Sequence, residues 1–389
     1  MKNRFVDFKL FKYLDWSTIL LLCGIAAMGI IAVANATSAT FTGEESSISE
    51  IVAKLDTSTI RLQVYWFLIG LVAMIFVTVP DYHALGDFYK WIYAINTLLL
   101  IVVFLASSET RGIQAWFRFG ERGFQPSEVA KIAIIITLAK VVSNITQNKG
   151  RITTIREIVP VLLYFVVPFA LIVIQPDMGT ASVYAFILLG ILIVSNTSFK
   201  LLGILFGIGA VAVFIIIISG FLEDYQVSRL LAFFNPDLAE EGAKYNLEQS
   251  MIAIGSGRFT GKGLFSPGNM SQLNYVPEKH TDFIFSVTIE AIGFIGGMIL
   301  IGLYMAVIFR CLYLAVRAKD HFGTYIIIGV ISMFMFHVFE NMGMTMGAMP
   351  ITGIPLPMMS YGGSNMLTTM AAFGLVLNVN MRSQRVSER

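Results

Sequence analysis

The chain has 389 residues, of which 56% are hydrophobic and only 13% are charged, and its formal net charge is +2. Soluble domains are less apolar and about 25% charged. This composition, with a mean hydropathy of +0.75, indicates an integral membrane protein. A net charge this close to zero gives no sign of a nucleic-acid partner. Two cysteines lie far apart in apolar runs, which favours inert core residues over a disulfide or a metal pair.

The first apolar run follows a basic N-terminus and ends near Thr37. It is longer than the apolar core of a secretory signal, and it has no convincing cleavage site of small residues. We therefore expect an uncleaved first transmembrane helix.

About ten segments are apolar and close to the ~20 residues that a bilayer requires. They cover residues 16–37, 63–80, 91–107, 127–146, 157–175, 179–196, 199–220, 283–309, 323–346 and 355–379. The predicted fold is an all-α polytopic membrane protein, a single membrane domain over residues 1–389 with a large extracytoplasmic loop between helices 7 and 8.

Short basic segments predict the orientation of the chain. They are the N-terminus and residues 149–156, 310–319 and 382–389. All fall on one side if the spans alternate, and the positive-inside rule makes that side the cytoplasm. We therefore expect both termini inside. The larger segments 38–62, 108–126 and 221–282 then lie outside, and the last is the one able to form a small structure of its own.

Asp282 lies where a polar stretch meets an apolar one. A carboxylate at a membrane boundary is costly to desolvate, so it usually marks a function. The alternative is an N-cap on the helix that follows, where the helix dipole favours a carboxylate. The sequence leaves both interpretations open.

Other polar residues gather on the same predicted side, and each has a structural alternative. Glu128 and Lys131 are three residues apart, so they share a helix face and could form a purely structural ion pair. Trp116 could anchor the chain at the membrane interface. Asp177 could cap a helix, and the small residues that follow Ser360 could permit close helix packing.

A glycine-rich stretch at residues 255–263 suggests a nucleotide site but does not fit a P-loop. Ser256 stands where the first glycine of that motif belongs, and Gly263 stands where Ser or Thr should follow the lysine. The stretch is therefore predicted to be a flexible turn. Its Arg258 and Lys262 could contact an anionic headgroup or could be solvated.

Six motifs in fixed order resemble the SEDS family of bacterial membrane proteins (RodA, FtsW and SpoVE). They are GIQAWFRFG at 112–120, FQPSEVAK at 124–131, QPDMGT at 175–180, the Gln-Ser and GKG elements at 249–250 and 261–263, PEKHTDF at 277–283 and PLPMMSYGGS at 355–364. LDW at 14–16, NMGM at 341–344 and MPITGIP at 349–355 resemble the RodA branch. Three residues depart from the family pattern: Arg258 replaces a common glycine, Glu290 stands where an acidic pair is usual, and Glu340 replaces a neutral residue.

The resemblance implies a peptidoglycan glycosyltransferase that polymerises lipid II at the outer face of the plasma membrane, in cell elongation and shape maintenance. It implies that Asp282 is the catalytic base, which takes a proton from the acceptor hydroxyl. The substrate-binding residues would be Trp116, Arg118, Glu128, Lys131, Gln175, Asp177, Arg229, Gln249, Lys262, His280, Thr281 and Ser360. The leaving pyrophosphate needs cationic stabilisation, from basic residues of this set or from a divalent cation, Mg²⁺ or Mn²⁺.

The implied partners are lipid II, membrane lipids and a class B penicillin-binding protein, the transpeptidase that crosslinks the glycan. The alternative function is a lipid II flippase. Transporters place their binding sites near the bilayer midplane, whereas the polar residues here gather on one side. That asymmetry favours an enzyme over a transporter.

Overall fold

The computed structural model describes residues 8–42, 48–106, 116–119, 122–220 and 222–387. Its helices are η1 (Phe8–Tyr13), α1 (Trp16–Thr37), α2 (Ile48–Lys54), α3 (Thr57–Thr78), α4 (Tyr82–Asp87), α5 (Tyr89–Ala106), α6 (Pro126–Lys149), α7 (Ile155–Ile174), α8 (Met178–Val194), α9 (Phe199–Ile218), α10 (Asp224–Phe234), η2 (Pro236–Leu238), α11 (Glu241–Ser256), α12 (Ile284–Val316), α13 (His321–Thr345) and α14 (Gly363–Ser387). A short antiparallel hairpin, β1 (Phe117–Phe119) and β2 (Arg122–Phe124), was not predicted.

The predicted all-α multi-pass architecture is confirmed. Within the described residues, eight helices are long and apolar enough to cross a membrane: α1, α3, α5, α6, α7, α9, α12 and α13. The shorter α8 and the C-terminal α14 stand where the other two spans were predicted. The last predicted span began too early, at residue 355. The chain up to Gly362 is not helical, because Pro355 and Pro357 restrict the backbone before them and lack an amide hydrogen.

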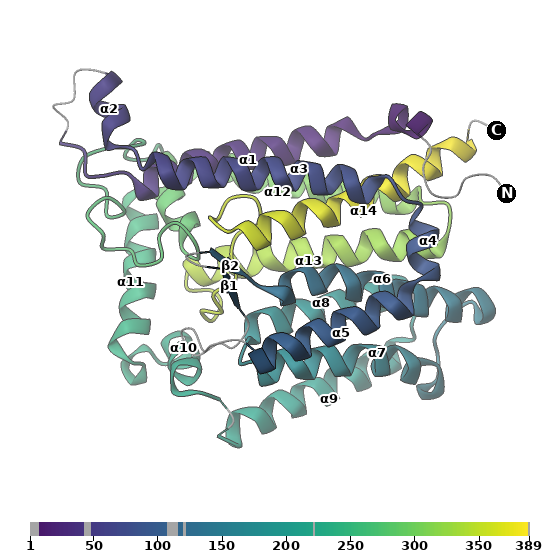
Figure 1. Cartoon of the computed structure of the whole chain (residues 1–389). Coiled ribbons are helices and arrows are strands. Elements are labelled where there is room, and N and C mark those ends of the chain that lie inside the picture. The colour runs from purple at the N-terminus through teal and green to yellow at the C-terminus, as the bar shows by residue number, and fades with distance from the viewer. Residues whose placement is uncertain (1–7, 43–47, 107–115, 120–121, 221, 388–389) are drawn as a thin grey trace.

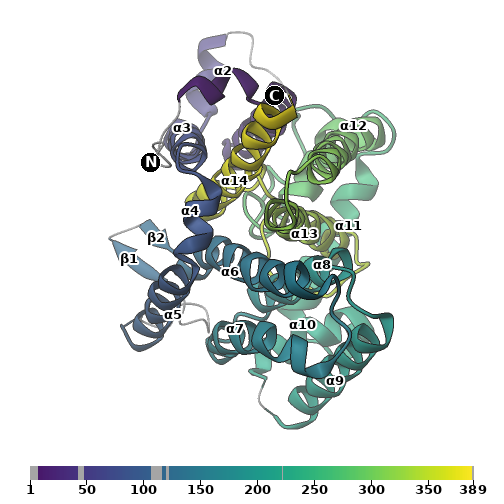
Figure 2. The same ribbon diagram turned by 90° about the vertical axis from the view of Figure 1, so that its right-hand side faces the viewer.

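The long helices run side by side, with α10, α11 and the hairpin at one end of the bundle and α4 at the other (Figure 1). The end-on view places α13 among α6, α8, α12 and α14 (Figure 2), and α13 packs against each of these helices. Most of α13 is buried. A polar side chain on α13 is therefore enclosed by protein instead of facing lipid.

Helix α12 is broken at Gly293, which has φ 69° and ψ −171°. The segment between α11 and α12 fills the break: Phe294 N donates to Arg258 O at 2.8 Å, and Lys262 N donates to Glu290 O at 2.9 Å. Backbone groups at membrane depth must be satisfied internally, and these bonds do so. The predicted span at 283–309 therefore needs correction, because only the part after Gly293 continues as an unbroken helix, to Val316.

Two charged clusters hold the opposite end of the bundle. Asp15, which caps α1, accepts a hydrogen bond from Arg310 Nε of α12 at 3.1 Å. His83 of α4 lies between two carboxylates, with Nδ1 2.9 Å from Asp81 Oδ1 and Nε2 2.7 Å from Asp320 Oδ2. The hydrogen bond to Asp320, and after it the one to Asp81, raise the pKa of His83 to about 9. Burial alone would raise the pKa of Asp320, but hydrogen bonds from His83 and Tyr82 lower it to about 2.

Candidate functional site

Asp282 lies in the turn before α12, and it is half-buried. The N-cap residue of α12 is Phe283, and no side chain caps the helix there. The interpretation of Asp282 as the N-cap is therefore wrong. The turn places its carboxylate one residue further from the helix.

The backbone of this turn is clamped from two sides. Asn341 of α13 donates through Nδ2 to Asp282 O and to Ile354 O, each at 2.8 Å. Ser360 donates through Oγ to Thr281 O at 2.7 Å and accepts from the amide of Leu356 at 2.8 Å. The hydroxyl of Ser360 thus joins the turn to the segment before α14, a positioning role where substrate contact was expected.

His280 belongs to the same clamp. Its carbonyl accepts from the Tyr361 amide at 2.8 Å, and the two rings lie 5.7 Å apart. His280, Thr281 and Asp282 are therefore held as one rigid turn. A rigid support is what a catalytic carboxylate requires, because misplacement by a fraction of an ångström reduces its effect.

Gly353 brings Asp282 and Arg229 together. A β-carbon built on Gly353 would lie 3.4 Å from Arg229 Nη1 and 3.4 Å from Asp282 Oδ2. Its φ of +74° is a conformation that favours glycine. A guanidinium and a carboxylate from segments about 50 residues apart therefore flank one bare stretch of backbone, and residues 352–354 form the floor of the site.

Helix α10 carries Arg229, and it is anchored on the turn between α7 and α8. Tyr225 donates its hydroxyl to Pro176 O at 3.3 Å, and Gln226 Nε2 donates to the same oxygen at 2.9 Å. The Arg229 guanidinium lies over the Tyr225 ring at 5.5 Å. These contacts fix the direction from which Arg229 reaches Gly353.

A second polar cluster lies at the N-terminal ends of α6 and α8. Asp177 caps α8 by accepting from Thr180 N at 3.0 Å, as the sequence suggested, and its other oxygen accepts from Gln125 Nε2 at 2.8 Å. Lys131 Nζ lies 2.7 Å from Glu128 Oε1, so the predicted ion pair is present, and both side chains are buried.

Two partners of this ion pair were missed in the sequence. His337 Nε2 lies 2.9 Å from Lys131 Nζ, and Asn365 Nδ2 donates to Glu128 Oε2 at 3.4 Å. His337, like Asn341, is a buried polar residue on the largely apolar α13, and the two are four positions apart, so they share a face. The four-residue spacing of these two polar residues in the sequence was the feature from which His337 could have been predicted as a site residue.

The segment 352–354 touches both clusters. A β-carbon on Gly179 of α8 would lie 3.1 Å from Thr352 O, and Thr352 Oγ1 donates to the buried Glu340 of α13 at 2.9 Å. The segment 352–354 therefore links the surroundings of Asp282 and Arg229, at Gly353, with Gly179, two residues from Asp177. Glu340, noted only as a departure from the family pattern, lies beneath this segment.

Other predicted site residues are engaged elsewhere. Lys262 pairs with Glu290 at 2.7 Å, beside the break in α12, and Met270 N donates to the same carboxylate at 2.8 Å. Gln175 is fully buried and donates to Leu100 O of α5 at 3.0 Å. The Lys262–Glu290 contact joins the loop to α12, and the Gln175–Leu100 contact joins the end of α7 to α5.

The remaining predicted residues lie on α11 and on the hairpin. Gln249 is half-buried on α11. Trp116 packs on the hairpin, where a β-carbon on Gly123 would lie 2.7 Å from its ring. Arg118 lies in β1 opposite Gly123, and its side chain is outside the described part of the structure.

Comparison with known proteins agrees with this arrangement. The family model FTSW_RODA_SPOVE, described as "Cell cycle protein", matches residues 15–385. The chain is 37% identical to peptidoglycan glycosyltransferase MrdB of Escherichia coli K12, over 82% of this chain and 85% of the relative. It is 34% identical to peptidoglycan glycosyltransferase RodA of Treponema pallidum, over 82% and 89%.

Solved structures show the same fold. A chain of a peptidoglycan synthase complex superposes with a TM-score of 0.74 at 26% identity, over 95% of this chain and 98% of that chain. The rod shape determining protein RodA of Thermus thermophilus gives a TM-score of 0.68 at 25% identity, over 94% and 96%. Since sequence and fold agree along nearly its whole length, the chain belongs to the FtsW/RodA/SpoVE family.

Proposed function

We propose that this chain is a peptidoglycan glycosyltransferase that polymerises lipid II, with Asp282 as its general base and Arg229 as the cationic group that approaches Gly353 beside it. The relatives that match over most of the chain are named for this activity. The observation that carries the residue assignment is that Asp282 Oδ2 and Arg229 Nη1 would each lie 3.4 Å from a β-carbon built on Gly353.

The chemistry requires a base and an anion stabiliser at one place. An acceptor sugar hydroxyl attacks the anomeric carbon of the donor, its O–H bond breaks, and Asp282 takes the proton. The new C–O bond forms as the bond from the anomeric carbon to pyrophosphate breaks. The pyrophosphate leaves with the electron pair, and a nearby guanidinium stabilises its added charge.

The buried Glu128–Lys131 ion pair has a structural role next to this site. Lys131 is neutralised by Glu128 at 2.7 Å and lies against His337. A buried charge that loses its partner is strongly unfavourable. We assign the pair to holding the N-terminal end of α6 beside Asp177, with Lys131 a lesser candidate than Arg229 for contact with pyrophosphate.

A Mg²⁺ or Mn²⁺ requirement stays part of the proposal. Among the described residues, no group of three or more His, Cys, Asp or Glu side chains is placed to hold a metal. Mg²⁺ is commonly bound by one or two carboxylates together with substrate phosphates. Asp282 with the lipid pyrophosphate is the donor set of that kind at this site, so the ion would be bound with the substrate.

The proposal includes an orientation and a partner. The basic segments support a cytoplasmic location for both termini, and the Asp282 site would then face outward. A structural neighbour belongs to a complex that coordinates polymerisation with crosslinking. This supports a class B penicillin-binding protein as the partner and a role in cell elongation.

Polymerisation of purified lipid II by the full-length chain, with and without that partner, tests the function. Glycan strands should form with wild type and should be lost with Asp282→Asn. Movement of lipid II across liposomes without glycan formation would support the flippase alternative and refute the proposal.

A further inference from the structure

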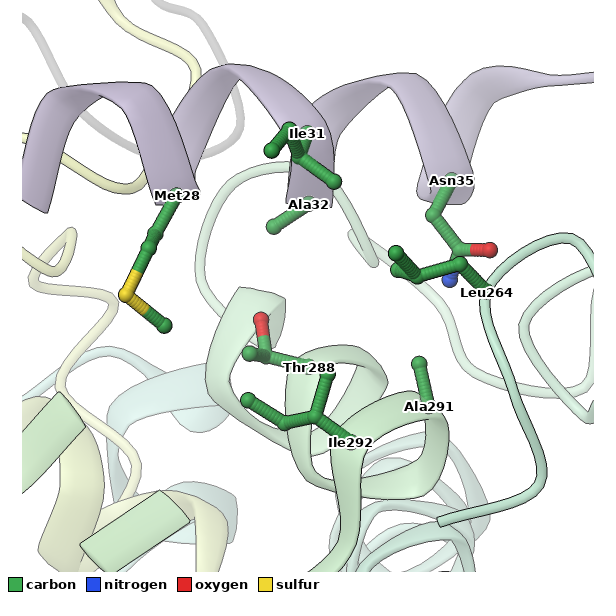
Figure 3. Close-up of a pocket in the computed structure, with 8 residues that line it drawn as sticks. All are labelled: Met28, Ile31, Ala32, Asn35, Leu264, Thr288, Ala291 and Ile292. Carbon is green, nitrogen blue, oxygen red and sulfur yellow. The ribbon is translucent and has the colours of Figure 1, made fainter. Parts of the chain in front are cut away.

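A crevice outside the candidate site lies between α1 and α12. Its lining residues are Met28, Ile31, Ala32, Asn35, Leu264, Thr288, Ala291 and Ile292, and its volume is about 120 Å³. Figure 3 shows the side chains of α1 facing those of α12 across it, with Asn35 and Leu264 at one end and Met28 at the other. The atoms exposed in the crevice are apolar, so it suits part of a hydrocarbon chain.

The crevice lies at the outer end of α1. Asp15 and Arg310 pair at the inner ends of these antiparallel helices. The unbroken part of α12 begins after Gly293, which is 17 residues from Arg310 in the sequence, and both helices rise at the same rate. Gly293 is therefore level with about Ala32, which lines the crevice. In the proposed orientation this is the outer boundary of the hydrocarbon region, where the glycerol esters of outer-leaflet lipids lie.

A buried polar group is unsatisfied at the same end. Asn35 is 1% exposed, and its Oδ1 accepts from Phe265 N at 2.7 Å. Its Nδ2 has no hydrogen-bond partner among the described residues. Buried donors are normally satisfied. In Figure 3 this nitrogen points towards Leu264, an exposed side chain on the outer loop. An ester carbonyl that displaced Leu264 would meet the free donor.

Arg258 adds a cation on the loop that is hydrogen-bonded to this part of α12. It is exposed, and its carbonyl is bonded to Phe294 N, two residues beyond Ile292 of the crevice. Its φ is +48°, a left-handed conformation that costs a non-glycine residue about 1 kcal/mol or more. An unfavourable backbone at a non-glycine position points to a function for the side chain. In the described structure its guanidinium makes no hydrogen bond or ion pair.

Exposed aromatic rings extend this surface. Phe259 and Phe294 are both exposed, with ring centroids 6.1 Å apart. Aromatic side chains are typical of the membrane interface. The Lys262 ammonium, by contrast, is neutralised by Glu290. Of these two cations, Arg258 is the one without a carboxylate partner among the described residues.

We propose that the crevice and Arg258 bind one anionic glycerophospholipid of the outer leaflet. An acyl chain occupies the crevice between α1 and α12, an ester carbonyl accepts from Asn35 Nδ2, and the phosphate lies against the Arg258 guanidinium. The lipid would brace the loop that fills the break in α12. This site is separate from the Asp282 region and does not depend on which residue is the catalytic base.

Native mass spectrometry of the full-length chain tests the headgroup contact. The protein is exchanged into phosphatidylglycerol or phosphatidylcholine with identical acyl chains. Wild type should retain phosphatidylglycerol preferentially. Arg258→Gly should reduce that preference about fivefold, the effect of one cation near an anionic surface. Glycine suits the left-handed backbone, so this variant should fold.

Two further variants isolate the charge. Arg258→Lys should keep most of the preference, and Lys244→Ala, which removes another cation of the outer segment, should leave it unchanged. Equal retention of the two lipids by wild type would overturn the proposal. So would an Arg258→Gly variant with undiminished preference.

A photoreactive phosphatidylglycerol with a diazirine in its acyl chain locates the tail. Adducts should map to residues 28–35 and 288–292, and Ile31→Trp, which fills the mouth of the crevice, should remove them while the thermal unfolding midpoint is retained. Adducts elsewhere would refute the site. Labelling by photoreactive undecaprenyl phosphate, with none by phosphatidylglycerol, would also overturn the proposal and assign the crevice to the polyprenyl substrate.

Discussion

Replacing Asp282 with Asn separates its catalytic role from a structural one. The contact that fixes the turn from α13 is accepted by the backbone carbonyl of Asp282, at 2.8 Å from Asn341 Nδ2. The side chain is not the N-cap of α12. Asn has nearly the same shape as Asp, so the turn and its bonds to Asn341 and Ser360 should persist. The side chain loses its basicity and its negative charge.

The size of the effect follows from general-base catalysis. A positioned base typically contributes 10²–10⁴-fold to a rate. At about 1.36 kcal/mol for each factor of ten, this is about 2.7–5.4 kcal/mol of transition-state stabilisation. Asp282→Asn should therefore lower the rate of glycan formation by about that factor, while lipid II binding and the thermal unfolding midpoint stay near wild type.

The assay is polymerisation of purified lipid II in liposomes, with glycan products resolved on a gel. Asp237→Asn is a matched control, because Asp237 is an exposed carboxylate of the same outer segment. It should polymerise at the wild-type rate. A well-folded Asp282→Asn variant that polymerises within a few-fold of wild type would refute the assignment of Asp282 as the base.

Three other predictions test the framework around the site. Glu128→Gln and Lys131→Met should each lower the free energy of unfolding by about 3–5 kcal/mol, because each leaves one buried charge without its partner. The double variant should lose less than either single variant. A double variant whose loss in thermal unfolding equals the sum of the two single losses would contradict this. His83 has a raised pKa of about 9 when folded, so its stabilisation is complete below its unfolded pKa of 6.5 and is lost as the pH rises through 9. The gap in unfolding midpoint between wild type and His83→Gln should therefore narrow from pH 7 to pH 10, and a constant gap would exclude the contribution. In a variant without native cysteines, Lys244→Cys should react with a membrane-impermeant thiol reagent from outside and Lys200→Cys should not; the reverse pattern would invert the proposed topology.

Sequence patterns that are local in the chain were sufficient for the architecture. Long apolar runs predicted the spans, because a bilayer requires about 20 apolar residues whatever their neighbours. The errors arose where local chemistry competed with hydropathy. Pro355 and Pro357 delay the start of α14, and Gly293 divides α12 where the outer loop supplies the missing hydrogen bonds.

The sequence by itself determined the class of protein, the order of its spans and the Glu128–Lys131 pair, because each depends on composition or on spacing within one helix. Only the tertiary structure decided which polar residues meet. Arg229 and Asp282 both approach Gly353, whereas Lys262, an equal candidate in the sequence, is neutralised by Glu290. His337 and Asn365 join the ion pair from helices more than 200 residues away. Such contacts arise from helix packing, and spacing along the chain does not encode the direction in which one helix faces another.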